Sequence, residues 1–140
     1  MIRIGLLSDT HSVLDDQILE DFSECDEIWH AGDIGSMEVL ERLEAFRPIR
    51  AVYGNIDNAK IRRACPLNQR FTVEGLDVFM THIGGYPGRY TARVRDIIRA
   101  KPPNLYICGH SHILKIMPDR KNNLLHINPN NQLYTVIRFQ

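Results

Sequence analysis

The chain has 140 residues, a length that suits one domain with a single substantial core. Its 17 basic residues balance its 17 acidic residues, so it lacks the basic surplus of proteins that bind a nucleic-acid backbone. Apolar residues make up 44%, an ordinary globular balance, and no apolar run reaches the length of a membrane span. The sequence therefore predicts one domain over residues 1–140, with no extended nucleic-acid surface and no membrane segment.

The first half alternates strand-like and helix-like segments. We expect strands over 2–8, 27–30 and 49–53, and helices over 13–24 and 37–46, the second of which Ser36 can cap. This alternation is typical of parallel β-α-β units whose helices cover a sheet.

The second half has a different pattern. Strands over 70–73 and 77–81 flank a turn at 74–76, and a helix over 94–99 ends before two prolines. Further strands are expected over 105–108, 114–117, 124–127 and 134–139. The whole pattern indicates an α/β domain with a mixed sheet or two packed sheets.

Three widely spaced cysteines favour neither a disulfide framework nor a zinc ribbon. The segment that starts at Met1 becomes polar too quickly for a signal peptide. We therefore expect a cytoplasmic protein with reduced thiols, in which Cys108 belongs to the core.

Five of the predicted strands run directly into residues that suit a metal ion. Ligands gather at the carboxyl ends of strands in open α/β sheets, so we expect these side chains to meet at one edge. Carboxylates and imidazoles bind divalent first-row ions, and an asparagine carbonyl is a neutral hard donor. The candidate ligands are Asp9, His11, Asp33, Asn55, His82, His110 and His112.

The charges of such a centre favour an anionic substrate. Two divalent cations bring four positive charges, of which Asp9, Asp33 and a bridging hydroxide remove three, so the remaining charge attracts a phosphate. Metals about 3.5–4 Å apart activate water and stabilise the phosphoryl oxygens of an in-line displacement. We expect Asp33 to bridge the metals with its two oxygens, and the bridging hydroxide to attack a phosphodiester.

The motifs resemble, in order, those of the calcineurin-like metallophosphoesterase superfamily, especially its small bacterial and archaeal phosphodiesterase branch. They are Asp9-x-His11, Gly32-Asp33, Gly54-Asn55, His82 and Gly109-His110-x-His112, and the resemblance runs from Ile2 to about Pro129. It implies an α/β fold in the form of a four-layer αββα sandwich, with two mixed β-sheets flanked by helices.

The resemblance also implies a role for each ligand. One metal would be held by Asp9, His11, Asp33 and His112, and the other by Asp33, Asn55, His82 and His110. Asp33, Asn55 and His82 are the predicted catalytic residues. The thiolate-free ligand set suits manganese first, with nickel, iron, cobalt and zinc as alternatives.

The predicted substrate is a phosphodiester, either a small molecule or a nucleotide, and a homodimer is expected only because some relatives dimerise. Two other functions stay open. One is a scaffold or protein-interaction module, like the retromer subunit that resembles this fold. The other is a phosphomonoesterase, for which the sequence shows no additional basic cluster.

Two stretches depart from the family pattern. Many members have a histidine where this chain has Ile56, which cannot transfer a proton, so hydrolysis would need a good leaving group or another donor. Asp57 is either that helper or the cap of the next helix, and we favour the cap. After Pro129, a short segment beginning Asn130-Asn131 replaces the longer small-residue stretch of relatives, as a trimmed rim or because residues are absent from the chain.

Some polar residues fit no ligand position. We expect His30 to be structural or to orient a ligand by a hydrogen bond, and His126 to pack near a sheet edge. Arg89 and Tyr90 either contact the substrate or open a surface helix, and we favour the helix.

Overall fold

The computed structural model describes residues 1–129 and 134–139, and its first sheet has the strand order β11-β1-β2-β3. β1, β2 and β3 are parallel, and β11 runs antiparallel to β1 with Ile137 opposite Ile4. The strands are β1 (Ile2–Leu7), β2 (Glu27–His30), β3 (Ile49–Ala51) and β11 (Thr135–Phe139).

The second sheet has the order β4-β5-β8-β10-β9. Its three central strands are parallel, and each edge strand is antiparallel to its neighbour. The strands are β4 (Asn68–Val73), β5 (Leu76–Thr81), β8 (Leu105–Ile107), β9 (Lys115–Asp119) and β10 (Leu124–Asn128). A small hairpin, β6 (Gly85–Tyr86) with β7 (Arg89–Tyr90), lies beside it.

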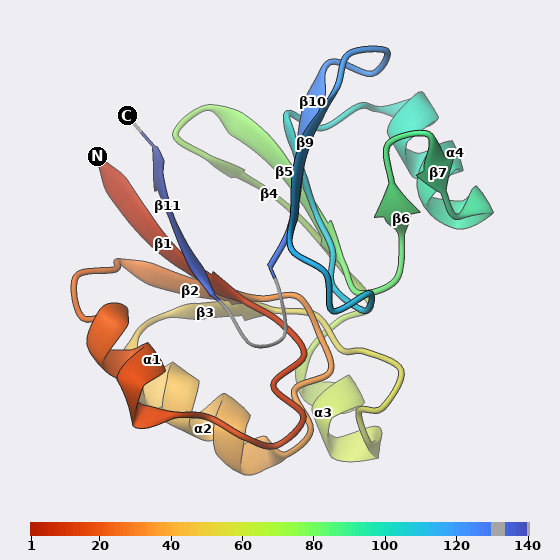
Figure 1. Ribbon diagram of the computed structural model, residues 1–140. Helices are drawn as coiled ribbons and strands as arrows, with labels where there is room; N and C mark the ends of the chain where they lie inside the picture. The colour runs from red at the N-terminus through yellow and green to blue at the C-terminus, as the bar shows by residue number, and fades with distance from the viewer. Residues whose placement is uncertain (130–133, 140) are drawn as a thin grey trace.

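The helices lie on the outer faces of the two sheets, as Figure 1 shows. The first sheet packs against α1 (Asp16–Asp21), α2 (Met37–Phe46) and α3 (Ala59–Ala64), and the second packs against α4 (Ala92–Ala100). Apolar side chains from both sheets, including Trp29 and Met80, fill the space between them. The predicted four-layer αββα sandwich of two mixed sheets is confirmed.

The caps of the two longer helices follow from local sequence. The Ser36 hydroxyl accepts a hydrogen bond from the Val39 amide at the start of α2, as the sequence predicts. Val39 and Leu43 are then buried on the side that faces the sheet. Thr91 caps α4 in the same way.

Two predicted helices differ from the structure. The helix expected over 13–24 is only α1, because the Asp15 carboxylate caps it at Gln17 and Val13 lies outside it, 71% exposed. The prediction that Arg89 and Tyr90 open a helix is wrong. They form β7, because Gly88, at φ +87°, lets the chain turn back on β6 before Thr91 starts α4.

Cys25, Cys65 and Cys108 are buried and form no disulfide. Cys108 lies in the core between the second sheet and α4. Within residues 1–129 and 134–139, no helix is both long enough and apolar enough to cross a membrane. The predicted short segment at Asn130 and Asn131 lies outside the described residues.

Candidate metal centre

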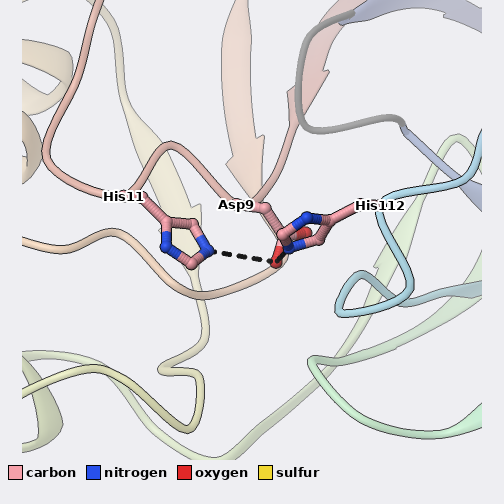
Figure 2. Close-up of side chains that lie close together, drawn as sticks. All are labelled: Asp9, His11 and His112. Carbon is pink, nitrogen blue, oxygen red and sulfur yellow. Dashed lines mark ion pairs between the residues drawn. The ribbon is translucent and has the colours of Figure 1, made fainter.

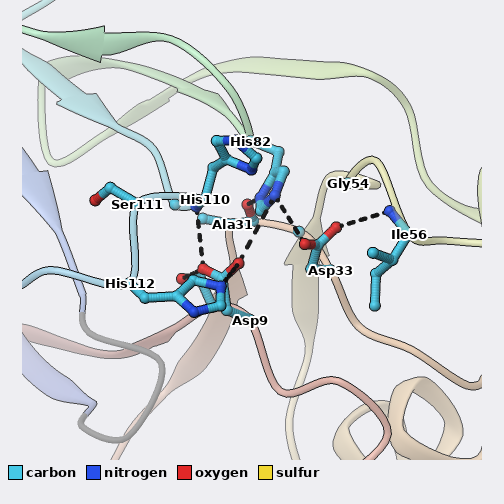
Figure 3. Close-up of polar contacts among 12 residues, drawn as sticks. Asp9, Ala31, Asp33, Gly54, Ile56, His82, His110, Ser111 and His112 are labelled. Carbon is cyan, nitrogen blue, oxygen red and sulfur yellow. Dashed lines mark hydrogen bonds and ion pairs between the residues drawn. The ribbon is translucent and has the colours of Figure 1, made fainter.

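The loops that follow β1, β2, β5 and β8 bring the six predicted carboxylate and imidazole ligands together at one edge of the sandwich (Figures 2 and 3). They form two groups, and within each group the ligand atoms lie within 4.8 Å of one another. One group is Asp9, His11 and His112, and the other is Asp33, His82 and His110. These groups match the two ligand sets that the family resemblance implies, apart from Asn55 and the sharing of Asp33.

The first group surrounds one oxygen of Asp9 (Figure 2). His112 Nε2 lies 3.2 Å from Asp9 Oδ1, and His11 Nε2 lies 3.9 Å from the same oxygen. The Asp9 side chain is fully buried, whereas the His11 and His112 side chains are 41% and 40% exposed. The carboxylate is thus held inside the protein while the imidazoles border solvent, an arrangement that leaves a path for an ion.

Asp33 belongs to the second group and also faces the first. Its Oδ2 is 3.4 Å from His11 Nε2 and 3.2 Å from His82 Nε2, so one oxygen faces an imidazole of each group. Its Oδ1 accepts a hydrogen bond from the Ile56 amide at 3.1 Å. The structure therefore turns a single oxygen of Asp33 towards both groups, rather than the two oxygens that we expected.

Two buried atoms at the centre have no hydrogen-bond partner among the described residues. They are Asp9 Oδ1 and His82 Nε2, which lie 3.7 Å apart. Burying a polar atom without a partner is costly, and a cation coordinated by both atoms would remove that cost. The residues present therefore fit a metal ion.

Neighbouring groups orient these ligands. His82 Nδ1 lies 2.7 Å from the Ala31 carbonyl, which can only accept, so Nδ1 donates and the lone pair of Nε2 points to the centre. Asp9 Oδ2 accepts hydrogen bonds from Ser8 Oγ at 2.5 Å and from the His110 amide at 3.1 Å. Ser8 was not predicted as a site residue, and its position directly before Asp9 is the one signal for it in the sequence.

Two motif glycines leave space that a side chain would fill. A Cβ atom on Gly54 would lie 2.0 Å from Asp33 Oδ1, and one on Gly109 would lie 2.7 Å from Asp9 Oδ2. Both glycines are therefore needed for the close approach of backbone and carboxylate.

Most of the ligands adopt a left-handed backbone conformation, which is uncommon for residues other than glycine. The φ values of Asp9, His11, Asp33, His110 and His112 lie between 48° and 73°. Such strain is typical of functional sites.

Asp57 links the loops after β2 and β3, and the prediction that it caps a helix is wrong. Its carboxylate accepts hydrogen bonds from the amides of Ile34 (3.2 Å), Gly35 (2.8 Å) and Gly54 (2.8 Å). Asn58 caps α3 instead. Asp57 therefore holds the loop that carries Asp33 against the loop that carries Asn55.

His30 is structural and supports the loops that follow β1 and β2. The Gly32 amide donates to His30 Nδ1 at 3.1 Å, so Nε2 carries the proton and donates to Thr10 Oγ1 at 3.0 Å. Burial lowers the pKa of His30 to about 3, which keeps the ring neutral. It bonds no ligand side chain directly, but both partners are neighbours of predicted ligands.

His126 lies near a sheet edge, as we expected. It belongs to β10, the neighbour of the edge strand β9, and it is fully buried. Its ring stacks on Tyr106 with the centroids 4.7 Å apart. This contact joins residues 20 positions apart, which sequence periodicity does not show.

The two groups consist of carboxylates and imidazoles, so they do not test Asn55, whose neighbour Ile56 donates its amide to Asp33. The Asn55 side chain is exposed, and it lines a cavity of about 470 Å³ together with His82. Its backbone carbonyl accepts a hydrogen bond from Arg62 at 3.2 Å, which leaves the side-chain amide out of this contact. Its role as a ligand stays a prediction.

Proteins of similar sequence include metallophosphoesterases. A probable metallophosphoesterase of Methanothermobacter thermautotrophicus is 31% identical over 114 residues, which are 78% of this chain and 66% of that protein. The chain thus spans just under two thirds of the length of this relative.

Solved structures share the fold over nearly the whole chain. A Thermotoga maritima protein has a TM-score of 0.79 at 26% identity, covering 100% of this chain and 93% of its own. An archaeal phosphodiesterase has a TM-score of 0.75 at 22% identity, covering 97% and 99%. Vps29 of Entamoeba histolytica, in complex with zinc, has a TM-score of 0.79 at 12% identity, covering 99% and 87%.

The family model for the calcineurin-like phosphoesterase superfamily domain matches residues 2–131, a range that contains every predicted ligand. The chain belongs to the calcineurin-like phosphoesterase superfamily.

Proposed function

We propose that this chain is a phosphodiesterase that uses two divalent metal ions held at the edge of the sandwich. The observation that carries the proposal is a pair of buried atoms, Asp9 Oδ1 and His82 Nε2, one from each ligand group, that have no hydrogen bond among the described residues. A cation coordinated by both atoms would remove the cost of burying them without a partner.

Each group would hold one ion. Asp9, His11 and His112 would bind the first, and His82, His110 and Asn55 the second, with Asp33 shared between them. The ions would supply an activated water and positive charge for the phosphoryl oxygens. Manganese is the first choice for this nitrogen and oxygen ligand set, with nickel, iron, cobalt and zinc as alternatives.

Neither Ile56 nor Asp57 can act as an acid for the leaving group. Ile56 stands where many relatives have histidine, and its amide is used by Asp33. The Asp57 carboxylate is 3% exposed and accepts three backbone hydrogen bonds, so it cannot reach a departing alcohol. Because a general acid contributes typically 10²–10⁴-fold, we propose that good leaving groups react far faster than poor ones.

A scaffold is the second candidate, because apolar side chains are exposed directly after His112. Ile113 is 61% exposed, Leu114 46% and Ile116 60%. Exposed apolar clusters mark interaction surfaces in many proteins. The similar fold of Vps29 agrees with either function, since a likeness at 12% identity concerns the fold alone.

One experiment separates these functions. Metal-stripped protein is supplied with manganese, nickel or zinc, and hydrolysis of bis(p-nitrophenyl) phosphate is measured beside that of p-nitrophenyl phosphate. Asp33→Ala tests the centre, and Asp96→Ala, an exposed carboxylate on α4, is the matched control.

Diester cleavage that returns with metal, disappears in Asp33→Ala and persists in Asp96→Ala is the expected result. Faster cleavage of the monoester would assign a phosphomonoesterase. No cleavage with any metal, while calorimetry shows two ions bound per chain, would favour the scaffold.

A further inference from the structure

A cavity of about 470 Å³ opens beside the second ligand group. His82 of that group and the predicted ligand Asn55 both line it. The volume falls within the range of cavities that bind small molecules. A phosphodiester carries two ester groups, so a cavity that adjoins the centre is where one of them would lie.

Part of the lining is apolar and open to solvent. Leu67 is 42% exposed and Ile83 is 38% exposed, and both line this cavity. The half-buried ring of Tyr53 lies in the same lining. Flat, apolar groups bind to such surfaces because they release water from both partners.

Arg62 adds a fixed positive charge next to the Tyr53 ring. Its Nε donates to the Asp57 carbonyl at 2.8 Å, and its Nη2 donates to the Asn55 carbonyl at 3.2 Å. The guanidinium carbon lies 4.8 Å from the centroid of the Tyr53 ring. These contacts hold the guanidinium in place before any ligand arrives, and its planar face is a stacking partner for aromatic groups.

Arg93 adds a second fixed charge. Its Nη1 donates to Asn68 Oδ1 at 2.9 Å, and its Nη2 donates to Thr81 Oγ1 and to the Ile83 carbonyl, both at 3.0 Å. The described residues that line the cavity include two arginines and no carboxylate. The cavity is therefore positive as well as apolar, which disfavours cationic groups.

We infer that this cavity binds an uncharged aromatic ester group of the substrate, such as a nucleoside, and rejects a cationic group such as choline. The inference rests on the proposed function, because it assigns the substrate class of the same site. The apolar side chains and the planar guanidinium supply stacking contacts, which any nucleobase can form. The arginines exclude a quaternary ammonium by charge repulsion.

The test measures equilibrium binding to manganese-loaded protein by titration calorimetry. Thymidine 5′-monophosphate, methyl phosphate and phosphocholine share a phosphate and differ in the ester group, and all three are products that a diesterase does not cleave. We expect the thymidine compound to bind at least tenfold more tightly than methyl phosphate, and phosphocholine to bind no more tightly than methyl phosphate.

Variants assign any preference to the cavity. The double change Leu67→Ala and Ile83→Ala should lower the ratio of thymidine monophosphate affinity to methyl phosphate affinity by roughly tenfold. Leu76→Ala, a similarly exposed leucine outside the lining at 38% exposure, should leave the ratio unchanged. A second readout is the circular dichroism of each variant, which should match that of the parent protein.

Equal affinities for thymidine monophosphate and methyl phosphate would overturn the inference, as would a preference that survives the double change. Cleavage of methyl p-nitrophenyl phosphate, measured separately, tests the proposed function alone. The preference without cleavage would therefore leave the cavity assigned and the catalytic proposal wrong, and cleavage without the preference would do the reverse.

Discussion

The carboxylate of Asp33 and the imidazole of His82 face each other with 3.2 Å between Oδ2 and Nε2, although they follow strands of different sheets. Asp33 follows β2 of the first sheet, and His82 follows β5 of the second. A ligand bound by both side chains would therefore connect the two halves of the sandwich, and its removal should weaken the whole fold.

The first prediction concerns metal removal. An ion that binds only the folded chain adds about 2.7 kcal/mol for each site when its free concentration is about 100 times Kd. We therefore expect manganese to raise Tm by several degrees and EDTA to reverse the change. In Asp33→Asn the rise should be much smaller, while Asp96→Asn should respond as the parent does. Scanning calorimetry measures both, and an unchanged rise in Asp33→Asn would exclude a role of this carboxylate in metal binding.

The second prediction concerns Gly109. A methyl group there would lie 2.7 Å from Asp9 Oδ2 and 2.8 Å from Ser8 Oγ, so Gly109→Ala must displace the carboxylate or its partner. We expect manganese affinity to fall by about 10–100-fold, as when the supporting contacts of other metal ligands are removed.

Gly75→Ala is the control for that change. Nothing lies within 4 Å of a methyl group at Gly75, but its φ of +79° makes alanine strained. This variant should lose roughly 1 kcal/mol of stability and keep its metal affinity. Titration calorimetry of both variants would disagree with the geometry if Gly75→Ala lost more affinity than Gly109→Ala.

The third prediction compares Asp57, which links two loops, with Asn58, which caps α3. Because its carboxylate accepts three backbone hydrogen bonds in a buried position, Asp57→Asn should cost about 2–3 kcal/mol of unfolding free energy. Asn58→Ala removes only the helix cap and should cost about 1 kcal/mol. Urea unfolding gives both values, and the opposite order would mean that Asp57 is dispensable as a link between loops.

The fourth prediction concerns pH. Burial lowers the pKa of His126 to about 4, below its ordinary value near 6.5, so the folded chain binds this proton less readily than the unfolded chain. The contribution of His126 is therefore complete above about pH 6.5 and is lost as pH falls towards 4.

His126→Phe keeps a ring that can stack on Tyr106 but removes the titration. Urea unfolding of the metal-free protein between pH 7 and pH 4.5 should show a shallower decline for this variant than for the parent. Parallel declines would show that His126 is not buried in the neutral form.

Much of this fold could be predicted from local patterns, and so could the place of the ligands. Ser36 and the apolar spacing of Val39 and Leu43 are enough to define α2, because a cap and one buried face depend on neighbours in sequence. The ligands follow strand ends, so the meeting of Asp9 with His112 could be inferred from the geometry of open sheets.

Other features depend on contacts between distant segments. Asp57 bonds Gly35 from 22 positions away, and nothing beside it in the sequence indicates that partner. His126 is buried by its stacking on Tyr106 of the neighbouring strand. The β6–β7 hairpin has only two residues in each strand, too few for an alternating pattern to be visible.

The left-handed backbone at five predicted ligands bears on how the centre can be engineered. Asparagine tolerates this conformation better than most residues, whereas β-branched residues do so poorly. Replacing Asp9 or His110 with valine would therefore disturb the loop as well as remove a ligand, and loss of activity would have two causes. Asparagine libraries at these five positions would vary the donor atoms on an unchanged main chain, which makes them the natural starting point for changing metal preference.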